Sequence, residues 1–86
     1  MSEATPENVL RVRDNGGSTF DRYTVVLADG TSPGCLDMLG LSIEPASPLG
    51  FSQWGEGVDG DHLGAIIAWS DLPATVRSHA NARLAE

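Results

Sequence analysis

Alternating apolar and polar positions predict β-strands in the first half of the chain. The clearest strand lies in TFDRYTVVLADG, where Tyr23, Val25 and Leu27 share one face and β-branched residues are frequent. The earlier stretch VLRVRD also alternates, and this pattern is typical of an edge strand over residues 9–13. The NGGS between them indicates a turn. A weaker strand is expected in MLGLSI, which Gly40 interrupts.

The second half predicts one further strand and a C-terminal helix. AIIAWS (65–70) is a short apolar run that is typical of a buried strand. Asp71 is expected to cap the helix, and Pro73 suits its first turn because an N–H there would have no partner. Apolar residues then recur at every fourth position, on one side of the helix: Leu72, Val76, Ala80 and Leu84.

These elements predict an α+β fold, with a small antiparallel sheet of three to four strands and one C-terminal helix packed on it. The polar start MSEATPEN (1–8) is expected to be a disordered tail, which leaves residues 9–86 as a single α+β domain. With 86 residues the chain buries one modest core and is too short for an enzyme with a cleft between two domains.

Composition favours a reducing compartment. Cys35 is the only cysteine, so the chain has no intramolecular disulfide. The longest apolar stretches, around 23–28 and 65–69, are far shorter than the roughly 20 residues of a membrane span. No basic start is followed by an apolar run, as a targeting segment would be. We therefore expect a cytoplasmic protein that does not bind membranes.

The net charge of −7 is concentrated in the middle of the chain. Residues 14–71 hold nine acidic side chains and one basic side chain, Arg22. This argues against direct nucleic-acid binding, because phosphate contacts need clustered arginine and lysine. The acidity either keeps a small protein soluble or forms a negative face for a basic partner. A Walker-type nucleotide site is excluded because the chain has no lysine.

The segment VDGDH brings three chemically capable side chains within four residues: Asp59, Asp61 and His62. A calcium loop of the EF-hand kind needs a longer ligand pattern that ends in a glutamate, and zinc sites draw on further Cys or His. The favoured interpretation is a solvated loop, with no metal, no cofactor and no catalytic residue. A small hydrolase-like enzyme that uses this loop is the alternative from another functional class.

The stretch PLGFSQWGEG (48–57) is the best candidate for a binding surface. Phe51 and Trp54 lie three residues apart in a segment too rich in glycine for a helix, which is expected to be a long loop. Either both aromatic rings fold inward and cap the core, or one stays exposed and anchors a protein partner. The residues proposed for binding are therefore these loop residues and their expected neighbours: Phe51, Gln53, Trp54, Glu56, Arg22 and Tyr23.

Three segments resemble a family of small bacterial and phage-borne proteins: DRYTVVLADG (21–30), LSIEPASPLGFSQWGE (41–56) and HLGAIIAWSDLPATVR (62–77). The shared pattern is a DRYTVV strand, a Ser-x-x-Pro-x-x-Pro-x-Gly-Phe-x-Gln segment, a His-Leu-Gly step and an Asp-Leu-Pro-x-x-Val helix start. The span of these segments covers about two thirds of the chain. TSPGCLDM (31–38) is longer than the family's connection. The resemblance implies no known activity, cofactor or catalytic residue.

These observations predict a small acidic binding or regulatory protein, bacterial or phage-related, that acts by protein–protein interaction and is not an enzyme. A more specific alternative is an inhibitor of a basic host or phage protein that mimics nucleic acid with its acidic face.

Overall fold

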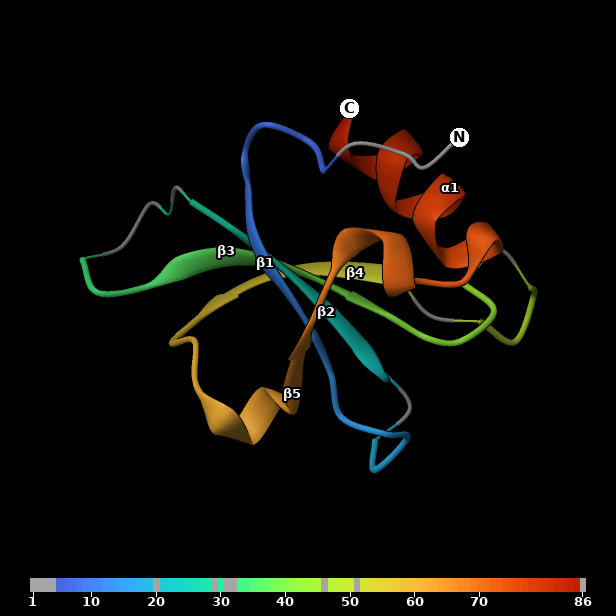
Figure 1. Cartoon of the computed structure of the whole chain (residues 1–86), viewed down its shortest axis with the longest axis horizontal. Helices are drawn as coiled ribbons and strands as arrows, with labels where there is room; N and C mark the ends of the chain where they lie inside the picture. The colour runs from blue at the N-terminus through green and yellow to red at the C-terminus, as the bar shows by residue number, and fades with distance from the viewer. Residues whose placement is uncertain are drawn as a thin grey trace.

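The computed structural model describes residues 5–19, 21–28, 30, 33–45, 47–50 and 52–85, which form one antiparallel sheet and one α-helix (Figure 1). The strands run in the spatial order β4-β3-β2-β1-β5. Their bounds are Val9–Asp14 (β1), Tyr23–Leu27 (β2), Leu36–Leu41 (β3), Ser52–Gly57 (β4) and Ala65–Ile67 (β5). Two 3₁₀ turns, Asp61–Leu63 (η1) and Trp69–Asp71 (η2), lie on either side of β5, and the helix α1 spans Ala74–Leu84.

The α+β prediction is confirmed, but the sheet has five strands and not three to four. The additional strand is β4, which falls in the glycine-rich segment that the sequence marks as a loop. Gly55 and Gly57 have low β-propensity, so the local pattern hides the strand. Pairing with β3 along all six residues of β4 overrides this local preference.

Two strands occupy positions that differ from those expected. β1 is not an edge strand, because it pairs with β2 on one side and with β5 on the other. β5 is not a buried strand, since Ala65 and Ile66 are exposed at the edge of the sheet. Pairing between segments about 50 residues apart produces both differences, and local periodicity does not report such pairing.

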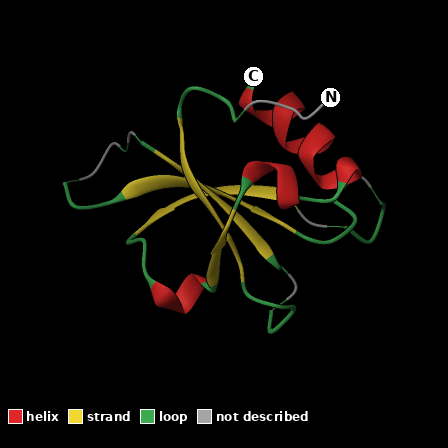
Figure 2. Ribbon diagram, viewed as in Figure 1, coloured by secondary structure: helices red, strands yellow, loops and turns green. Residues whose placement is uncertain are grey.

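The core lies between one face of the sheet and the C-terminal elements (Figure 2). Tyr23, Val25 and Leu27 of β2 face this core, as their alternation predicts. The helix stripe is confirmed as well: Leu72, Val76 and Ala80 are buried, and Leu84 is partly buried. The predicted cap is wrong in detail. Asp71 accepts a hydrogen bond from the Ala68 amide (3.0 Å) inside η2, and Pro73 immediately precedes the helix.

The connection from β4 to β5, residues 58–64, crosses the sheet face opposite α1, and we call it the crossover segment. Arg13 of β1 is 6% exposed and anchors this segment at two points. Its Nε donates to Asp59 Oδ1 (2.9 Å) and its Nη1 donates to the Gly64 carbonyl (2.9 Å). Gly64 has φ +104°, and a Cβ at this position would collide with the Asp14 backbone. Glycine is therefore required where the crossover segment meets β5.

Candidate binding surface along strand β4

Strand β4 is the longer edge of the sheet. It pairs with β3 in register from Leu41↔Ser52 to Leu36↔Gly57, and the described residues contain no strand on its other side. Every second residue of such an edge directs its N–H and C=O groups outward. The opposite edge, β5, has only three residues. Natural edges are commonly kept short or carry lysine or proline, but SQWGEG is six residues long and has neither.

The side chains of β4 alternate between the two faces of the sheet. Trp54 pairs with Leu39 and lies on the helix face, where it packs partly buried against the core. The Arg83 guanidinium of α1 lies 5.9 Å from the centroid of the Trp54 ring, within the range of a cation–π contact. Gln53 and Glu56 are exposed. Trp54 therefore both packs against the core and forms part of the surface.

Two shallow hollows flank β4, one on each face of the sheet. The hollow on the helix-free face has a volume of about 230 Å³, and Gly40 and Gly55 leave its floor without side chains. Its lining comes from the loop before β2, from strands β2, β3 and β4, and from the crossover segment. The residues are Asp21, Thr24, Met38, Gly40, Gln53, Trp54, Gly55, Glu56 and Leu63. The second hollow, of about 410 Å³, lies at Asp37, Trp54, Gly55 and Glu56. The edge strand thus has open space beside both of its faces.

Acidic side chains surround these hollows. Asp37 of β3 lies directly opposite Glu56 of β4 in the register, so two acidic side chains are neighbours on the helix face of the sheet. Asp21 lines the hollow on the helix-free face. The β4 surface, defined here as Asp37, Gln53, Trp54, Gly55 and Glu56, is therefore acidic.

The residues proposed from the sequence separate into two groups. Gln53, Trp54 and Glu56 lie together on β4. Tyr23 is 4% exposed and belongs to the core, in register with Leu41 and thus two strand spacings, about 10 Å, from β4. Phe51 lies outside the described residues. Asp37 and Gly55 were absent from the sequence prediction, because only the β3–β4 register brings Asp37 to Glu56.

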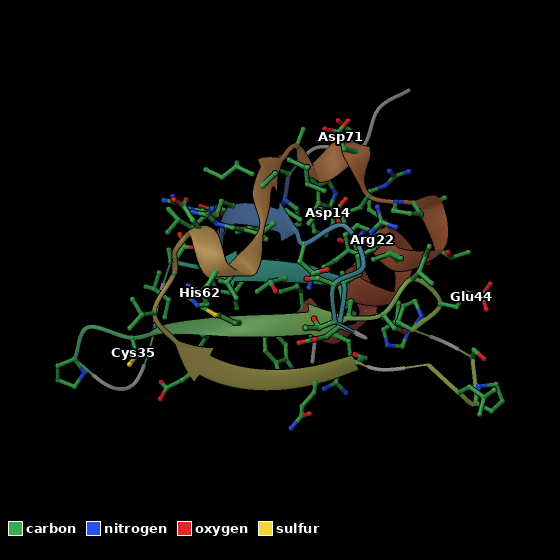
Figure 3. All side chains as sticks on the ribbon, turned by 90° about the horizontal axis from the view of Figure 1, so that it is seen from below. Asp14, Arg22, Cys35, Glu44, His62 and Asp71 are labelled. Atoms are coloured by element: carbon green, nitrogen blue, oxygen red, sulfur yellow. The ribbon has the colours of Figure 1, made fainter. Side chains whose placement is uncertain are left out.

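Arg22, the remaining proposed residue, is engaged with Asp14. Its Nε donates to Asp14 Oδ1 (2.8 Å) and its Nη2 to Oδ2 (3.2 Å), and the two side chains lie side by side in Figure 3. The Arg22 guanidinium also lies 5.3 Å from the centroid of the Tyr23 ring. These hydrogen bonds from Arg22, helped by one from the Gly16 amide, lower the pKa of Asp14, against a smaller opposing effect of burial.

Acid is expected to remove the stabilisation that this pair provides. Because the pKa of Asp14 is lower in the folded than in the unfolded protein, the contribution is fully present above the unfolded value of about 3.9 and is lost as the pH falls through the folded pKa. Asp14→Asn should therefore lower the urea midpoint near pH 7 and have a much smaller effect near pH 2. The exposed Glu7→Gln serves as the control. A difference between wild type and Asp14→Asn that does not change with pH would contradict this assignment.

The VDGDH residues do not converge on a reactive group. The two Asp59 carboxylate oxygens lie 3.0 Å from Arg11 Nε and 2.9 Å from Arg13 Nε, and the Asp59 side chain is only 12% exposed. Asp61 and His62 are exposed on the turn that follows. Figure 3 shows His62 apart from Asp14 and Arg22. Within the described part of the chain, no group of three or more His, Cys, Asp or Glu side chains is placed to hold a metal ion.

No protein-family model, curated protein or solved structure matches this chain. The resemblance to small bacterial and phage-borne proteins therefore stays a prediction. Among the described residues, no helix is both long enough and apolar enough to span a bilayer.

Proposed function

We propose that this protein is a small acidic binding or regulatory protein that recognises another protein through the β4 surface. The observation that carries the proposal is the six-residue edge strand with an open hollow beside each of its faces. Trp54 supplies the large amphipathic side chain that is common at the centre of protein interfaces, and Gln53 supplies exposed polar groups beside it. We further propose a cytoplasmic location and a bacterial or phage-related origin.

The binding proposal is favoured over the two alternatives by where the acidic side chains lie. A hydrolase that used the crossover segment would need carboxylates held together in a pocket, but Asp59 is bound by two arginines and Asp61 is fully exposed on η1. A nucleic-acid mimic would present its acids as one exposed array. Asp14 is instead paired with Arg22, and Asp71 accepts a backbone hydrogen bond in η2. Figure 3 places Glu44 and Asp71 on separate parts of the molecule.

Site-specific photo-cross-linking tests the proposed function. With benzoylphenylalanine in place of Gln53, the protein expressed in its native host should form a discrete adduct with one other protein. The control is the same substitution at Ser78, which is exposed on α1. Trp54→Ala in the Gln53-labelled protein should reduce the adduct several-fold, because it removes the central side chain of the β4 surface. Adducts that form from Ser78 and not from Gln53 would place the interface elsewhere and refute the proposal.

A further inference from the structure

The edge position of β4, which has no strand on its outer side among the described residues, indicates how a partner is recognised, and this inference rests on the proposed function. We infer that the β4 surface binds an extended, basic peptide segment, which adds to β4 as a sixth strand of the sheet. The edge has six residues in regular antiparallel register with β3, so its outward N–H and C=O groups are already arranged as a strand partner needs them. An added strand completes those hydrogen bonds without rearranging the sheet.

The two hollows match the alternation of side chains along an added strand. Successive side chains of a strand point to opposite faces of its sheet. A strand paired with β4 places one set of side chains beside Gln53 and Gly55, at the helix-free hollow, and the other set beside Trp54 and Glu56. A Cβ built on Gly55 meets no atom within 4 Å, which confirms that the floor of the first hollow is open. The surface therefore receives side chains on both faces of an added strand.

The charges around β4 favour a basic peptide over a second copy of this chain as the added strand. Asp21 and Glu56 line one hollow, and Asp37 and Glu56 line the other, while β4 itself has no basic residue. Arginine or lysine on the incoming strand would lie beside Glu56 and close to Asp37, whereas Asp21, about 14 Å (three strand spacings) away, adds only to the negative charge of the hollow. A second copy of this chain is a poorer occupant, because each copy carries a net charge of −7 and edge-to-edge pairing would bring two Asp37–Glu56 pairs together.

Designed peptides test whether binding depends on backbone hydrogen bonds, as strand addition requires, or on charge attraction alone. The probe is a fluorescein-labelled, acetylated Arg-Val-Arg-Val-Arg-Val amide, and its affinity is measured by fluorescence anisotropy. We expect it to bind, and we expect the form N-methylated at every residue to bind at least about tenfold more weakly, because it keeps the charges and loses the backbone donors. The Glu-Val counterpart should not bind. Amide hydrogen exchange should slow in β4 and stay unchanged in β5 when the arginine peptide is added.

A charge-matched pair of protein variants locates the contact. Asp37→Asn/Glu56→Gln removes the carboxylates beside β4, and Glu7→Gln/Glu44→Gln removes the same net charge from exposed residues that line neither hollow. The first variant should bind the arginine peptide at least about tenfold more weakly than the second. Thermal melts of both variants check that each remains folded at the temperature of the binding measurement. Equal affinities of the two variants would overturn the assignment to the β4 surface.

Different experiments test strand addition and the proposed function, so each can be refuted without the other. If the fully N-methylated peptide binds as well as the parent peptide, strand addition is wrong, while the cross-links from Gln53 are unaffected. If the arginine peptide does not bind and the protein instead sediments as a dimer with slowed exchange in β4, the occupant is a second copy and the inference is overturned. Absence of cross-links from Gln53 refutes the proposed function directly.

Discussion

Val76→Asp is expected to lower the free energy of unfolding by at least about 4 kcal/mol, which is enough to unfold much of a population of so small a domain. Val76 is fully buried between α1 and the sheet. An aspartate there places an ionised carboxylate in the core with no cationic partner. The measurement is urea denaturation followed by circular dichroism, and partial rescue at low pH is expected because protonation removes the buried charge.

The control for this variant is Ser78→Asp, two residues further along the same helix and exposed. It should change the free energy of unfolding by less than about 0.5 kcal/mol. If Val76→Asp has the same urea midpoint as the wild type, α1 does not pack on the sheet in solution.

Arg13→Leu is expected to destabilise the protein by about 3 kcal/mol. The change leaves the Asp59 carboxylate, 12% exposed, with Arg11 as its remaining ion-pair partner, and it removes the donor to the Gly64 carbonyl. Arg11→Leu is the comparison, because the Arg11 side chain is 35% exposed and its ion pair should contribute less than about 1 kcal/mol.

The double variant Arg13→Leu/Asp59→Leu tests the reason for that loss. It should be more stable than Arg13→Leu alone, because it also removes the largely buried Asp59 carboxylate, which in Arg13→Leu keeps only its ion pair with the partly exposed Arg11. Thermal melts of the wild type, Arg13→Leu, Asp59→Leu and the double variant provide the comparison. If the double variant is less stable than both single variants, the two side chains contribute through packing and not through the ion pair.

Strand β2 and the apolar stripe of α1 could be predicted from the sequence, because the spacing of apolar residues within each element shows which of its faces is buried. Tyr23, Val25 and Leu27 alternate, and Val76 and Ala80 recur at the helical spacing, so local periodicity is sufficient. Strand β4 could not be predicted, since its extended conformation comes from pairing with β3 and not from the preferences of its own glycines.

The candidate site was predicted in part for the same reason. Gln53, Trp54 and Glu56 stand out in the sequence as polar and aromatic residues among glycines. Asp37 does not, because it lies 19 positions away from Glu56 and only the strand register shows that the two carboxylates face one another. Tyr23 does not border the β4 surface, because its side chain lies on the core face of β2.

The crossover segment also has a consequence for folding kinetics. Strands β1 to β4 are joined in sequence and pair with their neighbours, so they form with short loop closures, whereas β5 must return to β1 across about 50 residues, as in the pair Asp14↔Ala65. We therefore expect the contacts that hold β5 in place, from Arg13 to Asp59 and to Gly64, to form after the rate-limiting step of folding. Arg13→Leu should accordingly accelerate unfolding in stopped-flow experiments and leave the refolding rate nearly unchanged.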